Sequence, residues 1–149
     1  APDGTTLATG AADSIVRLWD IGSGTVQREM EGHTRPVNSV AYAADGTRLV
    51  SASTDGTLVV WDVASGHALH TLDAHTEAVW DVAFAPEGMT LASASADGTV
   101  RLWDAATGRH LQVHATHSAM VMSVAFAPDG RTLASGVADG TIHLKTVTP

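Results

Sequence analysis

The sequence predicts an all-β fold of short antiparallel strands grouped into repeated four-stranded sheets. The first reason is a Trp-Asp pair that recurs every 42 residues without insertion or deletion, at Trp19-Asp20, Trp61-Asp62 and Trp103-Asp104. The second is two sets of turn residues with the same interval. They are Asp3-Gly4, Asp45-Gly46, Glu87-Gly88 and Asp129-Gly130, then Asp13-Ser14, Asp55-Gly56, Asp97-Gly98 and Asp139-Gly140. The third is that, in the segments between these turns, the character of the residues alternates with a period of two, which is typical of strands.

Each repeat contains four predicted strands, called a, b, c and d. In the repeat that follows Pro36 they cover Val37–Tyr42, Arg48–Ser53, Thr57–Val63 and His67–Leu72. The Asp-Gly pairs between a and b and between b and c supply the positive φ that tight hairpins need, at little steric cost. One such sheet cannot bury either face in water, so we expect the copies to stack side by side.

The same residues carry a resemblance to a known family. Gly32-His33 and Trp61-Asp62 match the two dipeptides typical of WD-repeat β-propellers, and the chain resembles that family over essentially its whole length. The resemblance implies that each sheet is a blade and that the blades ring a central channel, with strand a innermost. Complete blades are expected at residues 33–74 and 75–116, and partial blades at residues 1–32 and 117–149.

The resemblance also implies a buried hydrogen-bonded network in each blade. It runs from the tryptophan through a Ser or Thr of strand b and the His of the d-to-a turn to the Asp of the b-to-c turn. The complete sets are His33, Ser51, Asp55, Trp61 and His75, Ser93, Asp97, Trp103; the partial sets are Thr9, Asp13, Trp19 and His117, Ser135, Asp139. Lys145 stands where the fourth tryptophan is expected, which predicts an atypical terminal repeat.

Recurrence of Ser, His and Asp in successive repeats favours a structural role over a catalytic triad. A triad occurs once per active site and needs an open nucleophile beside an oxyanion hole. His110, His114 and His117 suggest a metal cluster, but four residues of strand span roughly 13 Å, too far for neighbours to share one ion. We therefore expect no catalytic residue, no metal site and no cofactor, and we interpret the strand-d histidines as solvated.

Composition argues against several other functions. The net charge is −8, yet eleven of the sixteen acidic residues occupy the repeated turn and Trp-Asp positions. The eight Lys and Arg residues are scattered, so we expect no nucleic-acid partner. The absence of cysteine removes disulfides and thiolate metal sites, and fits a reducing compartment such as the cytoplasm. No apolar run is long enough for a membrane span, and no membrane partner is expected.

The resemblance implies partner binding at the channel mouth, where strand a begins in successive blades. The matching positions are Pro36, Asn38, Ala78, Trp80, Met120 and Met122. An exposed Trp with Met neighbours is a surface that can anchor a peptide or a protein partner. Two interpretations stay open: these side chains bind such a partner, or they plug the channel and cover a neighbouring blade.

The repeat count leaves the ring open. The chain begins at strand b of its first repeat and stops after strand c of its fourth, so fourteen strands are expected and two blades are incomplete. Such a half-ring exposes blade faces and strand edges, which another chain or copy has to cover. We expect a homodimer joined head to tail into eight blades. The alternative is a longer polypeptide whose further repeats complete a ring of about seven.

The predicted function is a non-catalytic protein-interaction scaffold. An engineered fragment for ring assembly, with no evolved binding role, is a second hypothesis, since the first residue is not methionine and lies within a repeat. The third hypothesis is an enzyme or small-ligand binder that uses the channel. It needs a convergent set of polar residues beyond the repeat pattern, and the sequence offers none.

Overall fold

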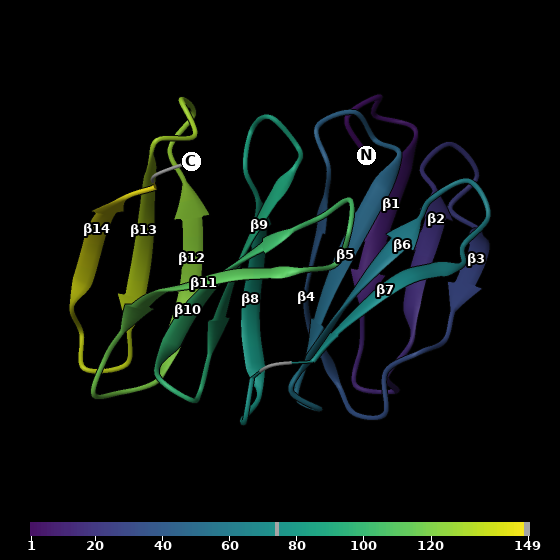
Figure 1. Ribbon diagram of the computed structural model, residues 1–149. Helices are drawn as coiled ribbons and strands as arrows, with labels where there is room; N and C mark the ends of the chain where they lie inside the picture. The colour runs from purple at the N-terminus through teal and green to yellow at the C-terminus, as the bar shows by residue number, and fades with distance from the viewer. Residues whose placement is uncertain (74, 148–149) are drawn as a thin grey trace.

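The computed structural model describes residues 1–73 and 75–147, and every regular element in them is a β-strand. Fourteen strands form four antiparallel sheets that follow one another along the chain (Figure 1). The all-β prediction is confirmed. The described residues include no helix that could span a membrane. Residue 74, expected to end one blade, and residues 148–149, expected to end the last, lie outside the described residues.

Strands within each sheet are hydrogen-bonded in chain order. The first sheet contains β1 (Thr6–Gly10), β2 (Val16–Asp20) and β3 (Val26–Met30). The second contains β4 (Val37–Tyr42), β5 (Arg48–Ser53), β6 (Thr57–Asp62) and β7 (Ala68–Asp73). The third contains β8 (Val79–Phe84), β9 (Thr90–Ser95), β10 (Thr99–Asp104) and β11 (His110–Thr116). The fourth contains β12 (Val121–Phe126), β13 (Thr132–Val137) and β14 (Ile142–Thr146).

Strand bounds in the second sheet follow the sequence prediction closely. Strands a and b have the expected bounds, whereas strand c ends one residue early, at Asp62, and strand d begins and ends one residue late. The cause is the turn between c and d. In this turn the Asp62 N–H donates to the His67 carbonyl at 2.9 Å, and the Gly66 N–H donates to the Asp62 carbonyl at 2.8 Å. Val63 and His67 therefore belong to the connection rather than to the strands.

The hydrophobic core lies between neighbouring sheets. Each cluster combines aliphatic residues of strand c in one sheet with residues of the following sheet. The clusters include Val16, Leu18 with Leu49, Trp61; Leu58, Val60 with Leu91, Trp103; and Val100, Leu102 with Val124, Leu133. Full burial of one such aliphatic side chain contributes roughly 1.5–3 kcal/mol. Stacking, rather than any single sheet, therefore stabilises the fold.

The tight turns use the positive φ that the repeated Asp-Gly pairs predict. Gly56 has a φ of 88°, and a Cβ at this position would lie 3.3 Å from the His75 carbonyl oxygen. Ser14 takes the corresponding place in the first repeat with a φ of 70°, and in the described parts of the chain it alone does so without being glycine. An L-residue in this region is strained by roughly 1–2 kcal/mol.

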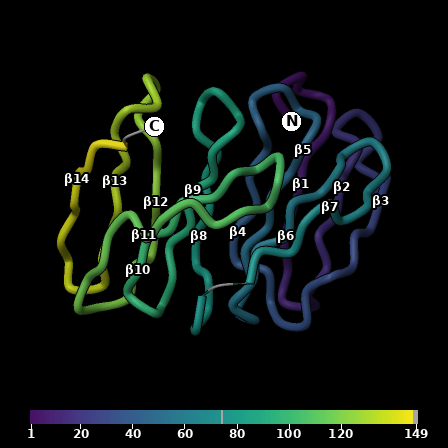
Figure 2. Tube along the Cα trace, in the orientation of Figure 1, coloured from purple at the N-terminus to yellow at the C-terminus, as the bar shows by residue number. Residues whose placement is uncertain are grey.

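The four sheets form an open row, with the first sheet at one end and the fourth at the other (Figures 1 and 2). Strand β8 contacts β4 on one side and β12 on the other, so the three strands of type a line the inner side of the row. This arrangement is a partial β-propeller whose end blades have three strands each. The expected open ring is confirmed within the described residues.

Candidate functional site

The structure joins four polar side chains in series in the second blade. The Trp61 indole N–H donates to Ser51 Oγ at 2.8 Å, and Ser51 Oγ lies 2.7 Å from His33 Nε2. His33 Nδ1 lies 3.1 Å from Asp55 Oδ2. When Nδ1 carries the ring proton, the indole donates to the hydroxyl, the hydroxyl to the imidazole and the imidazole to the carboxylate. The series therefore supplies partners for polar atoms that are buried or half-buried.

The third blade contains the same series. Trp103 donates to Ser93 at 2.9 Å, Ser93 lies 2.7 Å from His75, and His75 lies 2.8 Å from Asp97. Burial lowers the pKa of His75, and the hydrogen bond to Asp97 opposes this only in part. Burial alone would raise the pKa of Asp97, but hydrogen bonds from Thr99 and His75 outweigh it and lower this pKa to about 2. At neutral pH the pair is thus a neutral imidazole donating to a carboxylate.

The first blade holds a shorter version. Trp19 donates to Thr9 Oγ1 at 2.8 Å. Asp13, which matches the network aspartates by position, forms an ion pair with Arg17 at 2.8 Å, and Arg17 also pairs with Glu29 at 2.8 Å. The carboxylate at this end is therefore held by arginine, where the inner blades use histidine.

In the fourth blade the series is loosened. His117 Nε2 is 3.4 Å from Ser135 Oγ, at the long limit for a hydrogen bond. Asp139 accepts hydrogen bonds from the N–H and the hydroxyl of Thr141, and none from His117. The His117 ring instead lies against the ring of His143, with centroids 4.5 Å apart. The structure thus brings two of the three expected side chains together and leaves Asp139 outside.

Three histidines of strand d are packed rather than solvated, so that expectation is wrong for them. His114 is only 4% exposed, and its backbone carbonyl accepts a hydrogen bond from Lys145 Nζ. His70 Nε2 donates to the Ala106 carbonyl of the next blade at 2.9 Å. His110 is half-buried and sets its ring edge-on to Trp103, with centroids 5.0 Å apart. His70 and His114 contact the following blade, whereas His110 packs against strand c of its own blade.

The geometry of the series does not offer an open nucleophile. Ser51 and Ser93 are both 0% exposed, and each hydroxyl oxygen accepts an indole N–H. A nucleophilic serine needs a free approach to its substrate. Within residues 1–73 and 75–147, no group of three or more His, Cys, Asp or Glu side chains is placed to hold a metal ion.

The six predicted binding positions lie at the start of the inner strands β4, β8 and β12. They are Pro36, Asn38, Ala78, Trp80, Met120 and Met122. Met120 and Met122 are each 44% exposed, whereas Asn38 is half-buried and donates to the Val79 carbonyl of the next blade at 2.8 Å. Trp80 is also half-buried, and its indole N–H has no partner in the described part of the chain. The methionines are therefore open, while Trp80 is partly covered.

Asp81 forms an unusual set of hydrogen bonds between blades, and the sequence analysis did not identify it. Its carboxylate accepts hydrogen bonds from the hydroxyls of Ser39 and Ser123 at 2.8 and 2.9 Å, and from the N–H groups of Val82 and Val124 at 2.9 and 3.0 Å. Ser39, Asp81 and Ser123 hold one repeat position in three successive blades. The presence of aspartate where the neighbouring repeats have serine is the feature of the sequence that could have identified Asp81.

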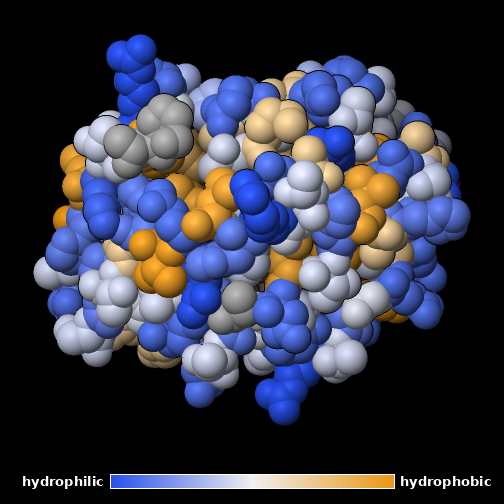
Figure 3. All heavy atoms as spheres, viewed as in Figure 1, coloured by the Kyte–Doolittle hydropathy of each residue, from blue (hydrophilic) through white to orange (hydrophobic). Residues whose placement is uncertain are grey.

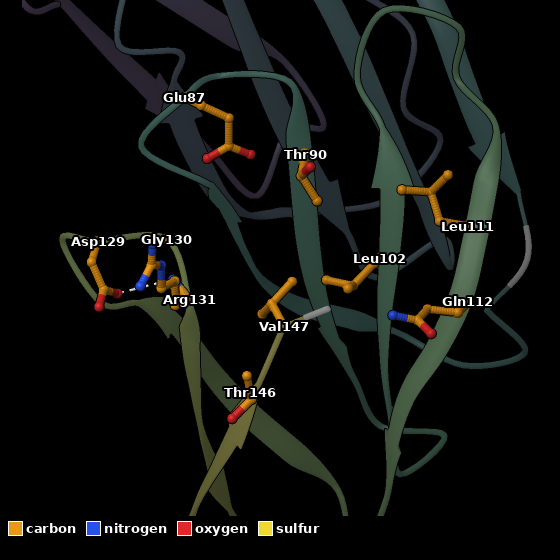
Figure 4. Close-up of a pocket in the computed structure, with 10 residues that line it drawn as sticks. All are labelled: Glu87, Thr90, Leu102, Leu111, Gln112, Asp129, Gly130, Arg131, Thr146 and Val147. Atoms are coloured by element: carbon orange, nitrogen blue, oxygen red, sulfur yellow. Dashed lines mark hydrogen bonds between the residues drawn. The ribbon is translucent and has the colours of Figure 1, made fainter. Parts of the chain in front are cut away.

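A groove of 760 Å³ lies between the third and fourth sheets (Figure 4). Glu87 and Asp129 line it and follow the ends of β8 and β12, so the groove is at the opposite end of the inner strands from the channel mouth. Gln112 also lines it, at the repeat position of Arg28 and His70, which bind carbonyls of the following blade. The groove is thus part of the contact between blades.

Comparison with known proteins agrees with this architecture. A family model described as the IFT122 first beta-propeller matches residues 1–149. Mitochondrial division protein 1 of Emericella nidulans is 53% identical over 36 residues, and its counterpart in Eremothecium gossypii is 56% identical over 36 residues. These segments cover 24% of this chain and only 6% and 5% of the two relatives. Each is shorter than one repeat, so this second similarity extends to a single repeat unit.

Proposed function

This chain belongs to the IFT122 first beta-propeller family, and on that basis we propose that it is a non-catalytic module that binds a protein or peptide partner at the channel mouth. WD-repeat β-propellers are typically protein-interaction scaffolds and are generally not catalytic. Because one fold supports many functions, the proposal depends on a particular surface and not on the fold alone.

The observation that carries the proposal is the exposed pair Met120 and Met122 at the start of β12, together with half-buried Trp80 on the neighbouring strand β8. Unbranched thioether side chains adapt to different apolar partners, and the half-buried ring of Trp80 adds aromatic surface at the repeat position of Met122. Arg35 and Glu77 are exposed on the turns before the same strands and supply a polar rim. An extended peptide with at least one large apolar side chain fits this combination.

The test is selection of peptides on the folded protein. Displayed random 12-residue peptides are enriched on the wild-type chain, and their affinities are then measured by calorimetry. We expect Met122→Ala and Trp80→Ala to weaken the selected peptides by about tenfold or more, since buried anchors dominate such interfaces. Met89→Ala is the matched control, because Met89 is 50% exposed and lies in a turn at the other end of the inner strands.

Peptides that bind Met120→Ala, Met122→Ala and Trp80→Ala as tightly as the wild type would defeat the channel-mouth assignment. Thermal unfolding of each variant separates a lost contact from a lost fold. A small-ligand site in the channel would instead give no peptide enrichment together with saturable binding of a small molecule.

Assembly is part of the same proposal: two copies join head to tail into a ring of eight blades, in a cytoplasmic setting that suits the cysteine-free sequence. The open row of sheets supports the ring. Sedimentation equilibrium should give twice the chain mass of 15.3 kDa. A mass of one chain would favour the alternative, in which further repeats of a longer polypeptide complete the ring.

A further inference from the structure

The outer side of β14 differs from every repeat-related surface in the chain. Ile142 is 77% exposed, while the residues at its repeat position, Val16, Leu58 and Val100, are all 0% exposed. Leu144 is 72% exposed, while Leu18, Val60 and Leu102 are at most 2% exposed. The inner residues at these positions are buried against the following blade. Hydrophobic surface is accordingly visible at the left edge of the molecule, where β14 lies (Figure 3).

The first sheet has the opposite exposure pattern. Leu7 of β1 is 53% exposed, while Leu49, Leu91 and Leu133 at the same repeat position are 0, 0 and 2% exposed. Trp19 is only half-buried, while Trp61 and Trp103 are 1 and 2% exposed. In the inner blades, these leucines and tryptophans are buried against the preceding blade. The first sheet therefore exposes the face that, in the inner blades, packs against strand c of the preceding blade.

We infer that Ile142 and Leu144 of one copy pack against Leu7 and Trp19 of a second copy. This inference rests on the ring assembly proposed above and names the residues of its seam. Two inner contacts supply the template, since they combine two aliphatic residues of strand c with a leucine and a tryptophan of the next blade: Leu58, Val60 with Leu91, Trp103, and Val16, Leu18 with Leu49, Trp61. The two outer faces of the described row of sheets offer the same combination, with Ile142 and Leu144 on β14 and with Leu7 and Trp19 on the first sheet.

Charge also permits this contact. Leu7 and Trp19 are cross-strand partners, and Arg17, two residues before Trp19 on β2, has its guanidinium paired with Asp13 and Glu29. The exposed side chains of Ile142 and Leu144 carry no charge. A contact between two copies of β14 would instead place Ile142 and Leu144 against themselves, an arrangement that none of the three inner interfaces contains.

A head-to-tail seam makes a distinctive prediction for single-face variants. Leu7→Asp disrupts the apolar face of the first sheet, and Leu144→Asp disrupts the apolar face of β14. Each variant alone should therefore sediment as one chain. An equimolar mixture should recover a two-chain species, because the intact β14 face of Leu7→Asp meets the intact first sheet of Leu144→Asp. Leu69→Asp is the control, since Leu69 is 44% exposed on β7 of an inner blade and should leave the wild-type mass unchanged.

The outcomes separate the seam from the assembly itself. A monomeric wild type would overturn both the ring and this seam. A dimeric wild type in which Leu7→Asp still dimerises on its own would overturn the seam and leave the assembly standing.

Disulfide trapping keeps the inference testable if an aspartate variant fails to fold. The chain has no cysteine, so Leu7→Cys and Leu144→Cys introduce single thiols into a clean background. Oxidation of a mixture of the two variants should give a covalent dimer in several-fold higher yield than oxidation of either alone. Equal yield from Leu144→Cys alone would show that the β14 faces pair with each other, and would overturn the proposal.

Discussion

The Ser39 hydroxyl donates to the Asp81 carboxylate at 2.8 Å, across two neighbouring blades and between equivalent positions of successive repeats. The same carboxylate accepts from Ser123 and from the Val124 N–H in the blade that follows. One side chain thus connects the inner strands β4, β8 and β12. In a repeat fold, each blade contacts only its neighbours, and here a single carboxylate forms hydrogen bonds to both neighbouring blades.

Replacing Asp81 should destabilise the chain. In Asp81→Ala the two serine hydroxyls and the Val124 N–H lose a charged acceptor, and we expect the free energy of unfolding to fall by about 1–3 kcal/mol. Urea unfolding monitored by tryptophan fluorescence measures this. Glu31→Ala removes the same charge from an exposed position and should change stability by less than about 0.5 kcal/mol. Equal effects of the two substitutions would show that the bridge contributes nothing.

Asp55 and Asp139 form a matched pair at one repeat position. Asp55 accepts from His33, from the Thr34 N–H and from Thr57, whereas Asp139 is exposed and accepts only from Thr141. We expect Asp55→Ala to lower the free energy of unfolding by about 2–3 kcal/mol and Asp139→Ala by about 1 kcal/mol or less. Thermal unfolding checks both, and an unchanged melting temperature for Asp55→Ala would contradict a structural role for the network.

Acidification should destabilise the fold in two stages. Burial lowers the pKa of His33 and His75 below the ordinary value of 6.5, so below pH 6.5 the unfolded chain binds protons that the folded chain excludes. Stability should therefore be constant with respect to these groups above about pH 7 and fall as the pH drops below 6.5. Asp97, whose pKa of about 2 lies below its ordinary 3.8, adds a second loss between roughly pH 4 and 2.

Urea midpoints measured from pH 8 to pH 3 test this dependence. Burial also lowers the pKa of His110, His114 and His117, so the double variant His33→Gln, His75→Gln should lose part of the change between pH 7 and 5 and not all of it. His67→Gln, at an exposed position, should retain it. A wild-type midpoint that stays constant from pH 7 to pH 5 is the result that would rule out two buried neutral histidines.

Ser14 offers a stabilising substitution. Its φ of 70° is the backbone state that glycine adopts at the same position of the other repeats, and Ser14→Gly should raise the free energy of unfolding by about 0.5–1 kcal/mol. The reverse change, Gly140→Ser, should lower it by about 1 kcal/mol, since Gly140 has a φ of 90° and open space for a Cβ. Opposite signs in denaturant unfolding are the expected signature, and a loss of stability in Ser14→Gly would contradict the strain argument.

Much of the architecture was predictable from the residues because its causes are local. Alternation fixes which residues face each side of a strand, and the Asp-Gly pairs mark where the backbone turns, so the bounds of β4 and β5 follow directly from the sequence. Val63 and His67 were misplaced by one residue, because the hydrogen bonds that close their turn depend on its folded shape. The candidate site was less predictable. Partial burial of Trp80 and the packing of His114 depend on which neighbouring strand covers them, and the sequence of one blade does not encode that contact.

The sequence by itself determined the repeat interval, the strands, the turns and the absence of a fourth tryptophan, since periodicity and backbone conformation are properties of short segments. Only the tertiary structure decided that Asp81 joins three blades, that the fourth network leaves out Asp139, and that Ile142 and Leu144 are open where their repeat counterparts are buried. The physical reason is that burial and hydrogen bonding between blades depend on what lies across each interface. Identical repeat positions therefore differ at the ends of the row, where one neighbouring blade is missing from the described residues.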